Sequence, residues 1–336
     1  MIKRIGADTI GFEDMPVISG NGSVVGKKEG EGPLKNDFDK IVYDMYFGQD
    51  TWEKAESALQ KEALSIALSK ADVKPDDIGF LFAGDLLNQC ISSSYGLKDY
   101  NIPYLGQYGA CSTMVQSLIM AAVMVESGAC HISACVTSSH FCSAERQYRF
   151  PLDYGGQRPQ SSQWTVTGSG SCIVKAEKSD KLPKISRATI GKIVDLGVTD
   201  QNNMGAAMAP AAASTLMTFF NDTNTQPNDY DAIYTGDLGV IGSKLLYELL
   251  SKEGIEIKGI HHDCGSMIFS DDMDAHCGGS GCGCCASVLC GHILKRMQKH
   301  ELNNVLVMAT GALLSPTSIK QKQSIPCIAH LVNIVI

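Results

Sequence analysis

The stretch PDDIGFLFAGDL, residues 75–86, is repeated as PNDYDAIYTGDL at residues 227–238. In each copy a proline-led turn precedes a short apolar run, and the run ends in Gly-Asp-Leu. Short apolar runs between turn residues are typical of strands buried on both faces of a sheet. Two such copies in one register indicate that the chain consists of two similar halves related by duplication.

A helical pattern precedes each copy. Residues 51–73 carry Leu59, Ala63 and Ile66 at helical spacing and predict a helix that leads into the first strand. Residues 210–224 predict a weaker helix, which we expect to begin near Pro210. Both halves are therefore expected to run helix, turn, strand.

Further apolar runs supply the later strands of each half. The first half contains HISACVTSSH (131–140) and SGSCIVKAE (169–177), and the second half contains NNVLVMATGAL (303–313) and CIAHLVNIVI (327–336). We expect two α/β halves, residues 1–180 and 181–336. Stacking them through their helices gives a five-layer α-β-α-β-α fold about a pseudo-twofold axis.

Composition excludes several classes of protein. The chain has 336 residues, 44% of them hydrophobic, and a formal net charge of −8 without a Lys/Arg-rich run, so we expect no nucleic-acid partner. The most apolar stretch, 118–125, is far shorter than the roughly 20 residues that span a bilayer. No secretion signal is recognisable at the N-terminus. The 13 cysteines are expected to be mostly free thiols in a reducing compartment.

A cysteine follows a strand in each half, in QYGACSTM (107–114) and HHDCGSM (261–267). Cys111 precedes an apolar helical pattern, with Ser112 and Thr113 as candidate caps. A thiol at a helix N-terminus experiences the positive end of the helix dipole. We therefore expect the pKa of the Cys111 thiol to be lowered.

These residues resemble a known superfamily. The duplicated plan, the GACSTM cysteine and the TGSGSCIVKA strand resemble thiolases and ketoacyl synthases, and GGSGCGCCA resembles their glycine-rich active-site loop. More closely, YGACSTM, HHDCG, GGSGCGC and TGALLSPTS are similar to the stage V sporulation protein AD family of endospore-forming bacteria. The resemblance covers nearly the whole chain.

The resemblance implies a function. It implies a non-catalytic protein that binds dipicolinic acid (pyridine-2,6-dicarboxylate), free or as its calcium chelate, and supports its uptake into the developing spore. It also implies integral-membrane partners in the same transport complex and a position in the forespore, peripherally at the inner spore membrane. Members of the superfamily commonly form dimers, so a homodimer is expected, and the apolar strand HISACVT (131–137) is the candidate contact.

Condensing enzymes of this superfamily need a His and an Asn, or two His, beside the cysteine to stabilise a developing negative charge. The resemblance aligns Gly236 and Asp237 with the region of the first histidine and Gly279 with the asparagine. A carboxylate repels an enolate and glycine has no side chain. Loss of one such donor costs about 10²–10³-fold in rate, so we expect no catalytic residues and no enzyme activity.

Two alternatives stay open at this point. The chain could be an acyltransferase or ketoacyl synthase with Cys111 as nucleophile, completed by a nearby histidine: His261, His262 or His276. It could also be a structural subunit of a membrane channel complex that binds nothing small.

A small aromatic dianion needs hydrogen-bond donors or cations in a partly apolar pocket. The helix start at Cys111 and the glycine loop 278–283 offer backbone N–H groups. Residues 138–159 offer cations and rings, although this segment also fits a surface or dimer-contact loop; its candidates are Arg146, Arg149 and Arg158 with Tyr148 and Phe150. The expected ligand-binding residues are Asp85, Cys111, Ser112, His140, Arg146, Arg149, Asp237, Asp263, Gly279 and Ser280.

Several of these candidates also fit structural roles. His140 closes a strand, and Asp85 and Asp237 occupy equivalent Gly-Asp-Leu steps, where crevices form at strand ends but where Asp also stabilises turns. The crowded HCGGSGCGCC (276–285) contains one C-x₂-C step, and Cys282 and Cys284 alternate as in a strand. We expect no metal site and no cofactor, with Ca²⁺ only as part of the ligand.

Overall fold

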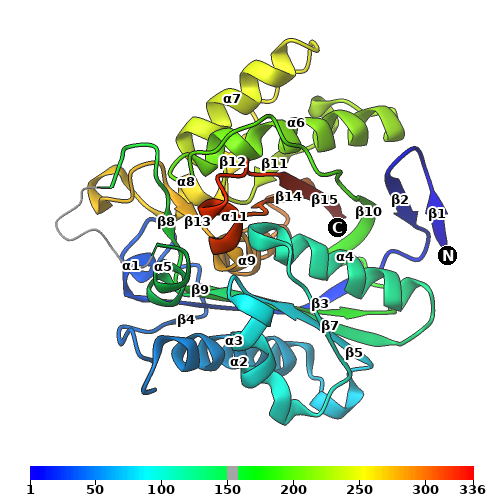
Figure 1. Ribbon diagram of the computed structural model, residues 1–336. Helices are drawn as coiled ribbons and strands as arrows, with labels where there is room; N and C mark the ends of the chain where they lie inside the picture. The colour runs from blue at the N-terminus through cyan, green and yellow to red at the C-terminus, as the bar shows by residue number, and fades with distance from the viewer. Residues whose placement is uncertain (150–157) are drawn as a thin grey trace.

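The computed structural model describes residues 1–149 and 158–336 (Figure 1). The central strands of the first half are β3 (Val17–Val25), β5 (Phe80–Gly84), β6 (Tyr104–Gly106), β7 (Ile132–Ser139) and β9 (Gly168–Lys175). Those of the second half are β10 (Lys184–Thr189), β11 (Ala232–Thr235), β12 (His261–Asp263), β14 (Asn304–Ala312) and β15 (Cys327–Val335).

The strand order repeats between the halves. In the first half it is β6-β5-β7-β9-β3, and in the second half β12-β11-β14-β15-β10. The two repeated sequence blocks thus supply β5 and β11, which occupy the same place in the order. The halves join where β3 meets β10, at the single register pair Val17–Lys184. The boundary at residue 180 falls between β9 and β10 and stays a prediction.

Helices complete a five-layer stack that Figure 1 shows from top to bottom. One outer layer holds α6 (Met204–Thr223) and α7 (Gly239–Ser251), and the other holds α2 (Trp52–Ala71) and α3 (Ile91–Leu97). The central layer holds α4 (Thr113–Glu126), which packs against strands of both halves, and α9 (Cys282–Val288), which packs against β3, β7 and β9. The expected α-β-α-β-α fold is confirmed.

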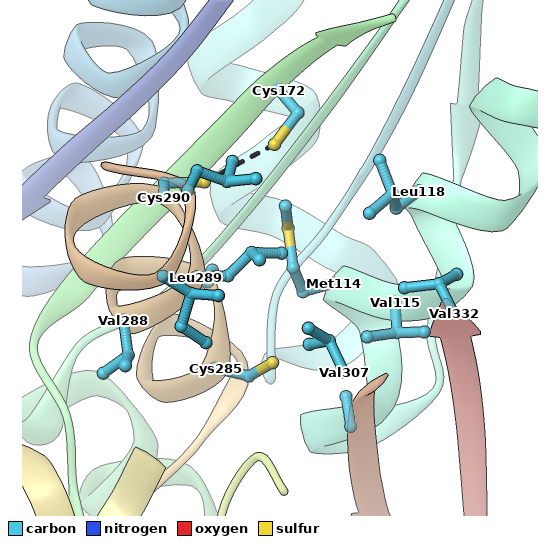
Figure 2. Close-up of a cluster of buried hydrophobic side chains, with 14 of the residues drawn as sticks. Met114, Val115, Leu118, Cys172, Cys285, Val288, Leu289, Cys290, Val307 and Val332 are labelled. Atoms are coloured by element: carbon cyan, nitrogen blue, oxygen red, sulfur yellow. Dashed lines mark hydrogen bonds between the residues drawn. The ribbon is translucent and has the colours of Figure 1, made fainter. Parts of the chain in front are cut away.

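The apolar core follows these layers. Its largest cluster lies between the strands of the first half and those of the second half, where Met114 and Leu118 of α4 meet Val307 of β14 and Val332 of β15 (Figure 2). Separate clusters lie under α6 and under α2. Because α4 is buried on nearly every side, Cys111 at its start is held inside the molecule.

The remaining elements are short. They are β1 (Ile2–Arg4), β2 (Thr9–Phe12), α1 (Lys27–Gly30), β4 (Lys40–Ile41), α5 (Phe141–Arg149), β8 (Trp164–Thr165), α8 (Cys264–Ile268), β13 (Gly279–Ser280), α10 (Leu294–Gln298) and α11 (Pro316–Lys320). β8 and β13 pair in parallel as a separate two-stranded sheet. Within the described ranges no helix is long and apolar enough to cross a membrane. All 13 cysteines are free thiols.

Two local expectations were wrong. The helix of the second half begins at Met204, after an Asn203 cap, and contains Pro210 in its interior. Proline is costly inside a helix because it removes one hydrogen bond, but the buried alanines on either side keep the helix docked. Residues Cys282 and Cys284 do not alternate in a strand; they lie in the first turn of α9, where both are buried.

Candidate functional site

Cys111 lines a cavity between the two halves. The first half contributes Ala110 and Tyr148, and the second half contributes Ser280, Gly281 and Met204; the enclosed volume is about 70 Å³. This volume suits a few water molecules or part of a small ligand. Most of the wall is apolar.

The Cys111 thiol is buried and protonated. Cys111 lies in a single turn, Ala110–Ser112, that leads into α4, and it is 6% exposed. Burial, followed by the nearby carboxyl of Asp237 and then Cys282, raises the pKa of the Cys111 thiol well above its usual value. The expected lowering of this pKa is therefore wrong, because burial of the thiol raises it.

Ser112 does not act as a helix cap. Its hydroxyl donates to the carbonyl of Gly109 at 2.6 Å, so it stabilises the turn before α4. The cysteine that lies beside Cys111 is Cys282, whose thiol donates to the Ala110 carbonyl at 2.9 Å. Cys264, the sequence counterpart in HHDCGSM, begins α8 instead.

Asp237 follows β11 and interacts directly with Cys111. Its carboxyl accepts a hydrogen bond from the Thr310 hydroxyl at 2.6 Å and a longer one from the Gly281 N–H at 3.4 Å. Burial raises the pKa of Asp237 to about 7, and hydrogen bonds from Cys111 and Thr310 offset only part of that. Near neutral pH this group exchanges between a proton donor and an anion, directly against the thiol.

Asp85 and Asp263 have another role. Asp85 accepts from the Leu87 N–H at 2.9 Å, from the Ser93 N–H at 2.8 Å and from the Ser93 hydroxyl at 2.6 Å. Asp263 accepts from the N–H groups of Leu238 and Gly239 at 2.8 and 2.9 Å. Neither lines the cavity, and both hold buried turns together.

His140 and Arg146 also lie away from Cys111. The Nδ1 of His140 accepts from the Cys142 N–H at 3.1 Å, so its Nε2 donates to the Met45 carbonyl at 2.9 Å. Burial lowers the pKa of His140. Arg146 pairs with Glu53 and lines a separate surface hollow of about 700 Å³. The side chain of Arg149 and the whole of Phe150 lie outside the described residues.

Of the two residues expected from the glycine loop, Ser280 lines the cavity and Gly279 does not. Gly279 lies in β13, where an added Cβ would come within 2.9 Å of both Ile268 and Val166. Ser280 and Gly281 line the cavity instead. Gly281 has a φ of +105°, which few other residues adopt, so this position needs glycine.

The sequence analysis did not select several wall residues, among them Glu145 of α5, Met204 and Leu314. Glu145 shares the helix of Tyr148 three residues away, a spacing that places both on one face. The guanidinium of Arg158, a cation expected near the site, forms an ion pair with Glu145 at 3.4 Å.

The three histidines that could complete a condensing site do not line this cavity. His261 is bonded to the Thr235 hydroxyl at 2.9 Å and the Tyr247 hydroxyl at 2.8 Å, and burial lowers its pKa to about 4. His262 is exposed on β12, and His276 lies 3.6 Å from Asp274. In residues 1–149 and 158–336, no group of three or more His, Cys, Asp or Glu is placed to hold a metal ion.

Five layers, two repeated halves and a buried cysteine at the start of the first central helix define a thiolase-like protein. Solved structures share this fold. Cerulenin-bound OleA from Xanthomonas campestris matches with a TM-score of 0.61 and 14% identity over 97% of each chain. The 3-oxoacyl-[acyl-carrier-protein] synthase III from Aquifex aeolicus matches with a TM-score of 0.59 and 11% identity, over 96% of this chain and 100% of that one.

Sequence comparison is more specific. The model of the stage V sporulation protein AD family matches residues 6–335. Stage V sporulation protein AD of Bacillus subtilis (strain 168) is 44% identical over 329 residues, which cover 98% of this chain and 97% of that protein. The chain belongs to the stage V sporulation protein AD family, and its role is in sporulation.

Proposed function

We propose that this chain is a non-catalytic binding protein for dipicolinic acid, free or as its calcium chelate, and that it supports uptake of the acid into the developing spore. The proposal rests on one observation above all: the Asp237 carboxyl faces the buried thiol of Cys111. A condensing enzyme needs hydrogen-bond donors there, because negative charge develops on the substrate carbonyl. The Asp237 carboxyl, whose pKa burial raises to about 7, opposes that charge whenever it is ionised.

The state of the thiol supports the same conclusion. A nucleophilic cysteine acts as thiolate, which requires a lowered pKa or an adjacent base. Here burial and Asp237 favour the neutral thiol. The cavity therefore lacks the electrostatics of a condensing site, which argues against turnover.

We further propose a homodimer that associates with integral-membrane proteins at the inner membrane of the forespore. The expected contact through HISACVT is wrong, because β7 is paired on both edges, with β5 and β9. In the first half β6 ends the strand order and has a free edge, where Tyr104 and Leu105 are 37% and 45% exposed. An exposed edge of this kind suits pairing with a second copy.

Isothermal titration of the full chain with dipicolinic acid, with and without Ca²⁺ and with benzoate as the control ligand, tests the proposal. We expect saturable binding that Leu314→Trp abolishes by filling the cavity, whereas Ile193→Trp, which places the same ring at a 65% exposed position, leaves binding unchanged. Acylation of Cys111 by acetyl-CoA, read by mass spectrometry, would instead support the condensing enzyme. Absence of any heat would support the structural subunit.

A further inference from the structure

Two carboxyl groups are buried close together under the outer helices of the first half. Glu56 of α2 and Asp85, which follows β5, are 1% and 0% exposed. Within the described ranges neither has a lysine, arginine or histidine at ion-pair distance. Burial, followed by the charge of Asp85, raises the pKa of Glu56 to about 8. Buried carboxyls normally have a cationic partner, because an uncompensated charge inside a protein is costly.

The side-chain amide of Gln60 lies between the two carboxyls. Its Nε2 donates to the Ser93 hydroxyl at 3.0 Å, which in turn donates to Asp85 at 2.6 Å. The same Nε2 donates to the Ser138 hydroxyl at 3.2 Å, which donates to Glu56 at 3.1 Å. Each carboxyl is thus one hydroxyl away from this amide.

Two oxygen atoms beside these carboxyls have no hydrogen-bond partner. They are the Oε1 of Gln60 and the Oγ of Ser92, and both side chains are 0% exposed. The Ser92 hydroxyl lies near enough to the Glu56 carboxyl to offset part of its raised pKa. Buried polar atoms are normally satisfied, so these two oxygens indicate that a further group binds between them. We call the four residues the Glu56 site: Glu56, Gln60, Asp85 and Ser92.

The Glu56 site lies directly behind the surface hollow of about 700 Å³, whose wall includes Leu87 and Ser143. The Leu87 N–H donates to Asp85 at 2.9 Å, and the Ser143 hydroxyl donates to Glu56 at 2.8 Å. Each carboxyl is therefore one residue away from the hollow. A small ion has a short path from solvent to the site.

We propose that the Glu56 site binds a divalent cation that prefers oxygen ligands. The two carboxylates balance the charge of the ion, the two orphaned oxygens supply neutral ligands, and water completes the coordination. The site has only two acidic residues, so it differs from a set of three or more His, Cys, Asp or Glu, of which the described ranges contain none. None of its residues lines the Cys111 cavity, so it requires no ligand there.

Manganese tests the proposal, because electron paramagnetic resonance reads free Mn²⁺ directly. The full-length chain is stripped of metal with a chelator and is then titrated with Mn²⁺ in the absence of any small-molecule ligand. We expect one saturable site per chain. Glu56→Gln keeps the size of the side chain and removes its charge, so affinity should fall more than about tenfold. Glu53→Gln is the matched control, because Glu53 lies on the same helix and lines the hollow.

Ser92→Ala separates ion binding from folding. The Ser92 hydroxyl has no hydrogen-bond partner in the protein, so its removal should leave urea unfolding without Mn²⁺ unchanged. The affinity for Mn²⁺ should fall about tenfold, because one ligand is lost. The control is Ser94→Ala, on the same helix, since the Ser94 hydroxyl is bonded to the Ile91 carbonyl at 3.3 Å.

Absence of saturable Mn²⁺ binding, or an affinity that either Glu56→Gln or Ser92→Ala leaves unchanged, overturns the site. Water would then be the group that fills it. Weaker Mn²⁺ binding in both variants, with both controls unaffected, supports the site. Neither outcome depends on dipicolinic acid, so the result holds whether or not calorimetry shows binding at Cys111.

Discussion

Asp85 and Asp237 stand at the same step of the two repeated blocks and differ in what surrounds them. Asp85 accepts three hydrogen bonds at 2.9 Å or less and is shut inside the turn that it stabilises. Asp237 has one short hydrogen bond, from Thr310, and interacts with the buried thiol of Cys111. Both halves thus keep a buried carboxylate at a strand end, but only that of the second half contacts the cysteine that lines the cavity.

The strongest test of this comparison is Asp85→Ala. The change leaves the N–H groups of Leu87 and Ser93 and the Ser93 hydroxyl without their acceptor inside the protein. Each orphaned group costs about 1–3 kcal/mol, so we expect a loss of about 4 kcal/mol in the free energy of unfolding, measured with urea. Asp76→Ala, at an exposed position nearby, is the control. A loss below about 1 kcal/mol would contradict the structural role.

A smaller effect is expected from the pH dependence of stability. Burial raises the pKa of Asp237 from 3.8 to about 7, so the folded protein holds a proton that the unfolded chain releases. Stability from this group is therefore full below about pH 4 and is lost as pH rises towards 7. Asp237→Asn removes that loss.

The measurement compares urea unfolding of the two proteins across this window. We expect the stability of Asp237→Asn relative to the wild type to rise by about 2 kcal/mol between the lower and upper ends of this window, less than the full linkage value because the folded protein relaxes around the ionised carboxylate. Glu29 and Glu56, with pKa values raised to about 7 and about 8, titrate in both proteins and cancel in the difference. If the free energies of unfolding of the two proteins changed in parallel with pH, Asp237 would be as well solvated in the folded protein as in the unfolded chain.

Much of the fold could be predicted from sequence, because it depends on patterns that repeat. The blocks at 75–86 and 227–238 each contain a turn, a buried apolar run and a strand end. Each block forms a strand, and the two strands hold the same place in the strand order of their halves. The start of α6 could not be predicted in this way. Proline usually ends a helix. Pro210 stays inside α6 because the helix packs against β14 and β15, which is a tertiary effect.

The site was only partly predictable for the same reason. Cys111 and Ser280 line the cavity, and Asp237 interacts with Cys111 from behind it; local motifs pointed to these three separate segments. Local sequence could not show that Arg146 pairs with Glu53 on another surface. Nor could it show how deeply Cys111 is buried. This burial raises the pKa of the thiol, whereas its position at a helix start predicted a lowered pKa.

The finest distinction between the two aspartates concerns the reactivity of Cys111. The carboxyl of Asp237 is, after burial, the largest cause of the raised pKa of the thiol. Asp237→Asn removes the charge and offers an amide N–H, so alkylation of Cys111 by iodoacetamide should become several-fold faster, as read by mass spectrometry of its peptide. Cys130 and Cys142, which are partly exposed, serve as internal references. Asp85→Asn should leave the rate at Cys111 unchanged. Equal rates in the two variants would mean that burial alone governs the thiol, and the second aspartate would then differ from the first in packing and not in chemistry.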